Sequence, residues 1–406
     1  FPALGFRLAA FGRDRFALAA WPLFVLCWAG TEFIRSYILT GFPWALPGYV
    51  WVNASPGQLA SVIGPYGLTL LTIAAASAPA TRLRWRAAPL VATAACLSAA
   101  FVWGGNRVVI EEKVVSDAPI IRIVQPNFPQ TVKWDIDKTR EHFDILLDLT
   151  RAGDLAPSVV VWPESAVTFP LDMAPVAVEE MTKAARGGEI AVGSLRVNGG
   201  PAAAETPPVR WRNSLFLVRP DGVLSEPFDK MHLVPFGEYL PFDAFFRSLG
   251  ILAVAGMSGG LVPGEAHALI KPREAPAFAP LICYEMIFPR EVMAAAEAAD
   301  WLILATNDAW FGSWWGPEQH LAQAQMRAIE TGKPIARSAN TGISAMITPY
   351  GEAMRRIEMA ERGYSDVRLP KPVRTLYATY GEALTIALIV LLVIPAFSGF
   401  RRGRAD

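Results

Sequence analysis

The hydrophobic positions of this chain form four long stretches near its two ends and many short runs between them. Each long stretch is apolar around most of a helix, and about 20 helical residues cross a bilayer core of roughly 30 Å. The stretches cover residues 17–39, 59–78, 87–103 and 383–397. We therefore expect four membrane-spanning helices, the last two extended by flanking residues. The alternative is that they are helices buried in a large soluble core.

The middle of the chain has a different pattern, in which short β-branched runs alternate with helical periodicity. Strands are predicted at IIRIV from Ile120, VVVW from Val159, IAVGS from Ile190, NSLFLV from Asn213, APLIC from Ala279, WLILAT from Trp301, PIARSAN from Pro334 and ISAMIT from Ile343. Helices are predicted over residues 137–151, 175–186, 289–299 and 317–331, and hairpin turns at residues 220–222 and 349–351. This alternation predicts an α/β domain.

These patterns divide the chain into three parts. Residues 1–105 hold three predicted spans, residues 106–375 form the α/β domain, and residues 376–406 hold the last span and a short tail. Because the chain begins at Phe1 in the middle of a pattern, we expect further N-terminal spans to precede it.

The positive charges in the short loops predict the orientation of the spans, because Lys and Arg concentrate on the cytoplasmic side. Three arginine clusters fall on one side under alternating topology: Arg13 and Arg15; Arg82, Arg84 and Arg86; and Arg401, Arg402 and Arg404. The α/β domain falls on the other side. We therefore expect a multi-pass protein of the bacterial inner membrane with a periplasmic domain. Glu32 and Arg35, inside the first span, should pair or line a lipid-headgroup cavity.

Composition supports a membrane protein and argues against a nucleic-acid partner. Hydrophobic residues make up 52% of the chain and charged residues only 18%, which is charge-poor for a soluble protein. Lys and Arg together number 37, as do Asp and Glu, so there is no basic excess to hold a phosphate backbone.

Cys283 is the candidate nucleophile. The other two cysteines, Cys27 and Cys96, fall in predicted spans, so Cys283 has no disulfide partner within reach, and a free thiol in an oxidising compartment suggests a reactive one. It ends an apolar strand ahead of a helix that begins near Pro289, a position that favours thiolate. The alternative is a buried, inert cysteine.

Two charged residues are candidates to assist this thiol. Glu164 follows the strand VVVW, where partial burial would suit its carboxylate to accept a thiol proton. Lys230, in FDKMHLVPFGEYLP, offers an ammonium that can neutralise an oxyanion. Taken singly, each is more typical of a solvated or salt-bridged surface residue.

The segments around these three residues resemble a known family. WPES with Glu164, DKMHLVPFGEYLP with Lys230 and ICYE with Cys283 are similar to the Glu-Lys-Cys triad segments of the nitrilase superfamily. Together with GFPW from Gly41, QPN from Gln125 and NDAWFG from Asn307, they resemble the apolipoprotein N-acyltransferase family over essentially the whole chain.

The resemblance implies a nitrilase-like α-β-β-α sandwich standing on a transmembrane helical bundle. It implies that Glu164 is the general base, that Lys230 supports the oxyanion and that Cys283 carries an acyl group as a thioester. The implied supporting residues are Glu238, Tyr284, Glu285, Trp134, Asn213, Asn307 and Trp310. The implied donor is a phospholipid and the acceptor is the α-amine of a diacylglyceryl-cysteine at a lipoprotein N-terminus; we expect a monomer.

An apolar segment after Glu238 suggests how lipid reaches this domain. Moving an acyl chain from lipid to water costs about 0.8 kcal/mol per methylene, so the site has to approach the bilayer. We expect an arm that enters the outer leaflet, formed by Phe242, Phe245, Phe246, Leu249 and Leu252. The alternative is an ordinary core helix and strand.

Other functions remain open on the residues alone. A membrane-tethered amidase or nitrilase would use the same triad with water as the acceptor. Gly256-Met257-Ser258-Gly259-Gly260 fits the serine-hydrolase pattern G-x-S-x-G, although no helix is predicted to follow it. A transporter or sensor is a non-enzymatic alternative. The four histidines lack zinc-ligand spacing and no phosphate-binding loop is present, so we expect no metal or other cofactor.

Overall fold

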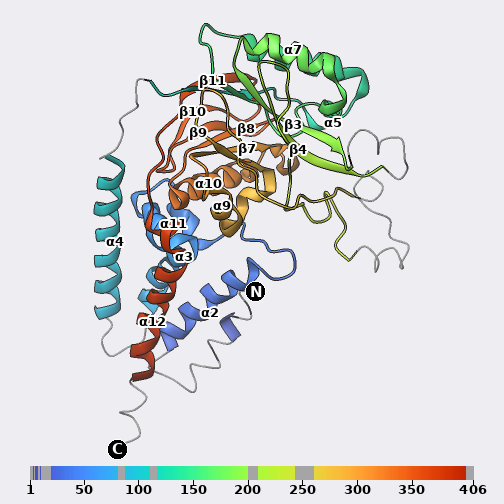
Figure 1. Cartoon of the computed structure of the whole chain (residues 1–406). Helices are drawn as coiled ribbons and strands as arrows, with labels where there is room; N and C mark the ends of the chain where they lie inside the picture. The colour runs from blue at the N-terminus through green and yellow to red at the C-terminus, as the bar shows by residue number, and fades with distance from the viewer. Residues whose placement is uncertain are drawn as a thin grey trace, which may run out of the picture.

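The computed structural model describes residues 20–80, 87–109, 117–199, 209–242 and 260–398, together with residues 3, 5–7 and 10. An α/β body lies at one end of the molecule and a group of helices at the other (Figure 1). The C-terminal helix α12 (Ala383–Ser398) runs away from the α/β body.

Six strands form the first sheet. Their order is β11 (Gly363–Arg368), β1 (Ile120–Gln125), β2 (Val159–Val161), β3 (Glu189–Val197), β4 (Trp211–Val218) and β5 (Phe228–Asp229). The central strands β1, β2 and β3 are parallel, and the remaining pairs are antiparallel. The carboxyl end of β2 leads directly to Glu164, so this sheet places one of the candidate residues at its edge.

Five strands form the second sheet, in the order β10 (Ala353–Ile357), β9 (Ser344–Ile347), β8 (Ile335–Ala339), β7 (Trp301–Thr306) and β6 (Phe278–Ile282). The strands β6, β7 and β8 are parallel, and β9 and β10 complete the sheet with antiparallel pairing. Cys283 immediately follows β6, so the second sheet presents the thiol at the carboxyl end of a parallel strand.

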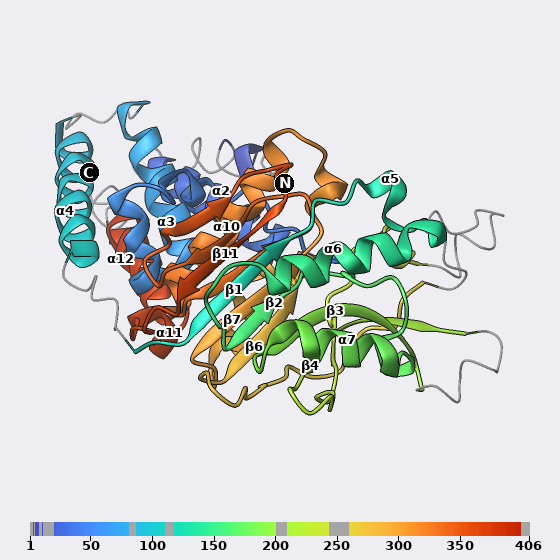
Figure 2. The ribbon, with the colours of Figure 1, turned by 90° about the horizontal axis from the view of Figure 1, so that it is seen from above.

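The two sheets pack face to face between two layers of helices, because their central strands are apolar on both faces. Ile121 and Val161 of the first sheet share a core with Ile303 and Met346 of the second. The helices α6 (Thr139–Arg151) and α7 (Pro175–Ala185) cover the outer face of the first sheet, and α9 (Pro289–Ala296) and α10 (Trp315–Thr331) cover the second. The layers are visible from above (Figure 2). The predicted α-β-β-α sandwich is confirmed.

The four apolar stretches are helical in the described residues. They correspond to α2 (Ala20–Arg35), α3 (Ala60–Ser77), α4 (Ala87–Val109) and α12. Within the described part of the chain, one helical stretch, Ser55–Ala80, is long and apolar enough to cross a membrane by length and composition. The predicted pairing inside α2 is present, because Arg35 Nε donates to Glu32 Oε2 at 3.1 Å.

The helix α3 is broken at Gly64, where the aromatic ring of Tyr377 from α11 (Leu376–Tyr380) packs against the backbone. Gly64 has φ of +64°, and a Cβ there would lie 2.1 Å from this ring. Pro65 follows and has no N–H to donate. Next to the break, the Thr385 hydroxyl of α12 donates to the Ile63 carbonyl at 2.5 Å. The break therefore joins α3 to the C-terminal segment.

The helical part is attached to the sandwich through α10. Ala60 and Leu68 of α3 pack against Met326 and Ile329 of α10. The Gln58 side chain donates to the Tyr350 carbonyl, on the turn between β9 and β10, at 2.7 Å. One end of each of α3, α4 and α12 lies toward the sandwich (Figure 1). These are the ends that the pattern of positive charges predicts to lie outside the cytoplasm.

Sequence patterns missed three of the four edge strands. All eight predicted strands overlap observed ones, but β5, β10 and β11 were not predicted. β10 contains Arg355 and Arg356, and β11 contains Asp366 and Arg368. These two strands lie at sheet edges, where polar side chains can reach water and the apolar signal of a strand is lost.

Candidate active site

Cys283 lies at a strained turn between β6 and a short 3₁₀ helix. Its φ is +50°, in the left-handed region that a side chain disfavours, and its side chain is buried. The 3₁₀ helix is Cys283–Ile287, and α9 begins only at Pro289. The predicted strand-to-helix turn and the helix that begins at Pro289 are therefore confirmed. The 3₁₀ helix that begins at Cys283 has only five residues, too few for a large dipole of its own.

The environment of Cys283 disfavours its charged form. Burial raises the pKa of the thiol well above its usual range, and the neighbouring Glu164 carboxylate raises it further. The ammonium of Lys230 and a hydrogen bond with Thr306 lower it in part. The position at the strand end therefore does not by itself produce a thiolate, which agrees with the expectation that Glu164 and Lys230 have to assist this thiol.

Glu164 is a buried carboxylate on the first sheet, and the chain around it is tightly packed. A Cβ on Gly193 of β3 would lie 2.7 Å from the Ser165 nitrogen, so only glycine allows β3 to approach this turn. Glu164 Oε1 accepts from Asn213 Nδ2 at 2.7 Å and from Lys230 Nζ at 3.3 Å. Its other oxygen, Oε2, is buried and has no hydrogen-bond partner among the described residues. That oxygen is free to accept a proton.

Lys230 follows β5 and is fully buried between two carboxylates. Its Nζ donates to Glu238 Oε1 at 2.8 Å and to Glu164 Oε1 at 3.3 Å. Burial alone would lower the pKa of the ammonium, but Glu164 and Glu238 outweigh burial and hold the pKa above its usual range. Lys230 thus stays protonated and supplies a fixed positive charge next to Cys283.

Glu238 and Asn213 complete the polar surroundings of this lysine. Glu238 Oε2 accepts from the Val234 backbone at 2.8 Å, which fixes the loop that carries the carboxylate. Asn213, on β4, also approaches Glu238 Oε1, at 3.4 Å, and its carbonyl accepts from the Lys230 backbone at 2.8 Å. The asparagine side chain therefore touches both glutamates while its backbone holds the lysine.

Tyr284 and Glu285 hold the nucleophile turn to other parts of the chain. Glu285 is buried, and its carboxylate accepts from the backbone nitrogens of Ile282 and Met231 at 2.6 and 2.7 Å. Burial raises the pKa of Glu285 to about 7. The Tyr284 hydroxyl donates to the Gly41 carbonyl at 3.4 Å. Glu285 therefore clamps the Cys283 turn to the segment of Lys230, and Tyr284 links it to the GFPW loop.

A buried hydrogen-bond network that was not predicted contacts the backbone of the Cys283 turn. His320 Nε2 lies 3.2 Å from the Cys283 carbonyl, and its Nδ1 lies 2.9 Å from Asp308. Arg337 and Thr306 donate to the same carboxylate at 2.6 and 3.0 Å. Burial alone would raise the pKa of Asp308, but Arg337 and His320 outweigh burial and hold it well below its usual range. These contacts keep Asp308 ionised and hold the Cys283 backbone.

The remaining candidate residues lie at different distances from this centre. Asn307 is buried and joins Gln130 to Asn340 through hydrogen bonds of 3.0 Å each. Trp134 and Trp310 are exposed, as is Phe242 at 70%. The other arm residues, Phe245, Phe246, Leu249 and Leu252, lie outside the described residues, as does Ser258.

Lys133 is a further charged residue at this centre that the sequence prediction missed. It ends the short helix α5 (Gln130–Lys133), is buried, and its Nζ donates to the Glu164 carbonyl at 2.9 Å. Its charge interacts with both Glu164 and Cys283. Its only sequence signal is the position next to Trp134 in QTVKW.

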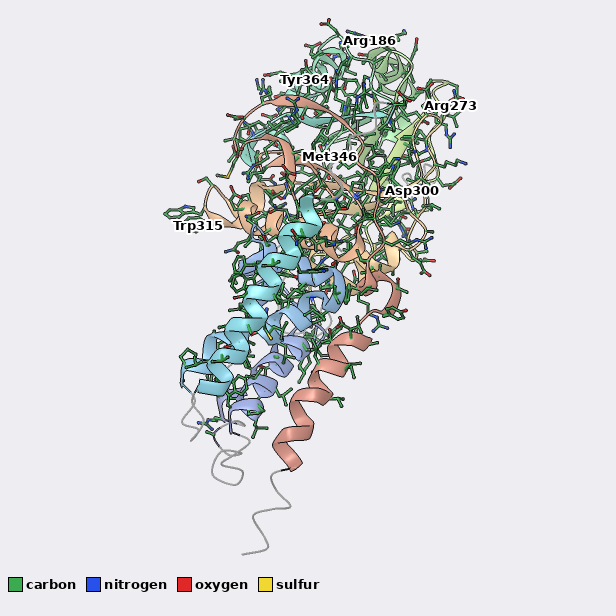
Figure 3. All side chains as sticks on the ribbon, turned by 90° about the vertical axis from the view of Figure 1, so that its left-hand side faces the viewer. Arg186, Arg273, Asp300, Trp315, Met346 and Tyr364 are labelled. Atoms are coloured by element: carbon green, nitrogen blue, oxygen red, sulfur yellow. The ribbon has the colours of Figure 1, made fainter. Side chains whose placement is uncertain are left out.

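A large cavity lies apart from these residues. Its volume is about 1120 Å³, and it is lined mainly by apolar side chains of α2, α9 and α11, such as Phe33, Met293 and Tyr377. None of the candidate catalytic residues lines it. Trp315, at the start of α10, projects from the surface of the molecule (Figure 3). No group of three or more His, Cys, Asp and Glu side chains within the described ranges is arranged to hold a metal ion.

His232 does not contribute to the charged centre. Its Nδ1 lies 2.8 Å from Glu291 and its Nε2 lies 3.2 Å from the Thr40 carbonyl, while its ring stacks on Phe288. It therefore forms part of the contact between the sandwich and the loop after α2.

The arrangement as a whole has the parts needed for covalent catalysis through a thiol. It combines a buried nucleophile, a carboxylate with one free oxygen and a permanent ammonium. This geometry fits both a hydrolase and a transferase, because water and an amine would use the same three groups as acyl acceptors.

Comparison with known proteins identifies two family matches. Residues 120–377 match the carbon-nitrogen hydrolase family, and residues 1–78 match the apolipoprotein N-acyltransferase N-terminal domain. The first match covers the sandwich and all three candidate catalytic residues.

Similar proteins agree with both matches. Apolipoprotein N-acyltransferases of Rhodopseudomonas palustris and Bradyrhizobium diazoefficiens are 37% and 38% identical to this chain, over 90% and 89% of it and 71% of each relative. That of Brucella melitensis is 36% identical over 93% of the chain and 72% of the relative. Among solved structures, an amidase from Nesterenkonia sp. AN1 is 18% identical with a TM-score of 0.49, covering 68% of this chain and 99% of the amidase.

Proposed function

The chain belongs to the apolipoprotein N-acyltransferase family, and we propose that it works through a thioester on Cys283, formed with Glu164 and Lys230. It is an acyltransferase that N-acylates lipoproteins, and its substrates are a lipid and a lipoprotein. One observation supports this proposal most directly. The buried ammonium of Lys230 contacts Glu164 and Glu238, and its charge interacts with the Cys283 thiol.

In the first half-reaction, Cys283 Sγ attacks an ester carbonyl of a phospholipid. Glu164 takes the thiol proton as the sulfur–carbon bond forms, and its unpaired Oε2 supports this role. The Lys230 ammonium stabilises the oxyanion of the tetrahedral intermediate. When the intermediate collapses, the carbon–oxygen bond breaks, protonated Glu164 returns its proton to the leaving oxygen, and lysophospholipid leaves a thioester.

In the second half-reaction, the N-terminal α-amine of a diacylglyceryl-cysteine attacks the thioester carbonyl. Glu164 accepts a proton from the attacking amine, and the same ammonium stabilises the second oxyanion. The carbon–sulfur bond then breaks, the amide leaves, and the sulfur recovers the proton from Glu164. Each proton and leaving group is accounted for by these three side chains, so the scheme requires no cofactor.

We also propose that the helical part lies in the inner membrane with the sandwich on the periplasmic side. Apolar side chains exposed on the helices support this, among them Val91 and Val102 on α4 and Ile386 on α12. Trp314 and Trp315 are also exposed, and tryptophan favours the bilayer interface. On this proposal residues 1–105 and 376–406 are membrane segments, residues 106–375 form the catalytic domain, and the protein acts as a monomer.

Intact-protein mass spectrometry tests the thioester directly. The full chain in detergent micelles is incubated with a phospholipid, and the proposal predicts a mass increase of one acyl group. The adduct should be removed by hydroxylamine and be absent in Cys283→Ser. No adduct in the wild-type chain, or an unchanged adduct in Cys283→Ser, would refute the proposal.

The acceptor separates the transferase from an amidase-like hydrolase with the same triad. A lipopeptide with a free diacylglyceryl-cysteine amine should discharge the acyl-enzyme within one turnover, whereas buffer alone should leave it intact over the same time. The N-acetylated form of that lipopeptide is the matched control, because it binds the same way but has no nucleophile. Equal discharge by buffer and by the lipopeptide would favour hydrolysis.

A further inference from the structure

Lys133 is held in place by a polar frame that links the ends of two strands. Asn340, after β8, donates to the Phe128 carbonyl at 2.8 Å and accepts from the Phe128 nitrogen at 3.0 Å. Asn307, after β7, donates from Nδ2 to Gln130 Oε1 at 3.0 Å. Both asparagines are buried. The frame therefore fixes the start of α5 against the sheet that carries Cys283.

The side chain of Lys133 points inward from this frame. It is 2% exposed, and its ammonium donates to the backbone carbonyl of Glu164 at 2.9 Å. Its charge acts on two groups, the Glu164 carboxylate and the Cys283 thiol. Trp134, the next residue, is exposed, and the Lys133 nitrogen lies 5.9 Å from its ring centre. Lys133 thus contacts the backbone of Glu164 directly, and its charge interacts with both Glu164 and Cys283.

This lysine differs from Lys230 in how its charge is compensated. Lys230 contacts two carboxylates, whereas none of the ion pairs among the described residues includes Lys133. Burial without a paired carboxylate disfavours the ammonium, and burial lowers the pKa of Lys133 to about 8. A neutral amide would donate to the Glu164 carbonyl without this penalty. A purely structural role therefore does not account for a lysine here.

We propose that Lys133 is a positioning residue for acyl transfer, which holds the backbone of Glu164 in place and provides a second positive charge that stabilises the Cys283 thiolate. The inference rests on the proposed function, since it assigns a role within the same site. Together with Lys230, the ammonium offsets the burial that disfavours ionised sulfur. The site then has two cations. Lys230 is paired with carboxylates, whereas Lys133 has no carboxylate partner among the described residues and stabilises the thiolate.

The test measures thiolate formation without using the lipid reaction. In a full chain with Cys27→Ser and Cys96→Ser, iodoacetamide alkylation of Cys283 at pH 7 is followed by intact mass. Lys133→Met removes the charge and keeps the length of the side chain, and we expect alkylation to slow by about 10-fold, equivalent to about one pKa unit of the thiol. Lys133→Arg keeps the charge and should stay within about threefold of the parent.

Lys333→Met is the matched control, because Lys333 is a half-buried lysine whose pKa is also lowered by burial but which lies away from the thiol. It should leave alkylation unchanged. The thermal melting temperature of Lys133→Met at pH 7 should change by no more than a few degrees, because the lost hydrogen bond to the Glu164 carbonyl is offset by removal of a buried cation that has no paired carboxylate. This outcome separates an electrostatic role from loss of the fold.

The same variants are then assayed for acyl-enzyme formation. Lys133→Met should lower the acylation rate constant by about 10-fold with little change in the phospholipid concentration at half-saturation. Parent-like alkylation and acylation in a folded Lys133→Met would overturn the inference and leave the triad intact. A wild-type chain that alkylates readily but forms no acyl-enzyme would instead refute the proposed function.

Discussion

Two buried carboxylates, Asp308 and Glu164, interact with the same cysteine, and their oxygens are paired differently. Asp308 has both oxygens paired, one with His320 and Thr306 and the other with Arg337. Glu164 has one oxygen paired with Asn213 and Lys230, while its Oε2 has no partner among the described residues. Both lie at the ends of parallel strands, so position in the fold does not explain the difference.

The comparison indicates which charges hold the fold and which perform chemistry. A buried carboxylate with every oxygen paired stays ionised and stabilises its surroundings, and Asp308 fixes the turn under Cys283 through His320. A buried carboxylate with an open oxygen can accept a proton at the moment of attack. Replacing Asp308 should therefore lower the stability of the fold more than the rate of acyl-enzyme formation. Replacing Glu164 should lower the rate more than the stability.

The largest expected effect is the loss of acyl-enzyme formation when Glu164 is replaced. Glu164→Gln keeps the Oε1 contacts but removes the base, and we expect acyl-enzyme formation to slow by roughly 10²–10⁴-fold. The melting temperature should change by no more than a few degrees. Rapid-quench acylation and near-ultraviolet circular dichroism measure the two quantities. A variant that unfolds would show that Glu164 is a structural residue like Asp308.

The second prediction concerns Asp308. Asp308→Asn leaves Arg337 and His320 buried without their carboxylate, which should lower the free energy of unfolding by about 3–5 kcal/mol. Thermal unfolding in detergent measures this loss. At temperatures where the variant stays folded, acylation should fall less than in Glu164→Gln. A stable variant with abolished acylation would reverse the assignment.

A smaller effect is expected in the pH dependence of thiol reactivity. The Lys133 pKa is lowered to about 8 by burial, so its positive charge is present below pH 8 and is lost as the pH rises through that value. The groups that act on it are Glu164 and Cys283. The rise of the Cys283 alkylation rate with pH should therefore flatten between pH 8 and 9. In Lys133→Arg the rise should continue, and an identical profile in both chains would contradict the assignment.

The smallest effect is expected at the proposed membrane arm. Phe242 is 70% exposed and has φ of +56°, so Phe242→Ser should leave the fold intact. We expect a few-fold loss of acylation from phospholipid in vesicles, and a larger loss when Phe245, Phe246 and Leu252 are also changed. A short-chain, water-soluble ester serves as control, since its turnover should not change. Unaltered vesicle turnover in the combined variant would remove the arm from the account.

The sequence predicted the elements whose signal is local. Glu164 and Cys283 follow uninterrupted apolar strands, and such strands are evident from their composition. The four-layer sandwich follows from the same alternation of strands and helices together with the family resemblance. The edge strands β10 and β11 were missed because their charged side chains hide the strand pattern.

The burial and pairing of Asp308, Arg337 and Lys133 were not predicted, for a different reason. Asp308 and Arg337 are 29 residues apart, and only the pairing of β7 with β8 brings them together. Lys133 is the last residue of a short helix, where a lysine is usually solvated, and its burial depends on Asn307 and Asn340 from distant strands. Patterns along the chain do not carry such contacts.

Single-turnover acylation located by peptide mass spectrometry tests the central claim most directly. Wild-type chain and Glu164→Gln are quenched within the first turnover on phospholipid, digested, and searched for the acyl group. The account predicts a hydroxylamine-sensitive adduct on the peptide of Cys283 in the wild type and at most a trace in Glu164→Gln. An adduct on another residue such as Ser258, or equal acylation of Cys283 in both chains, would contradict it.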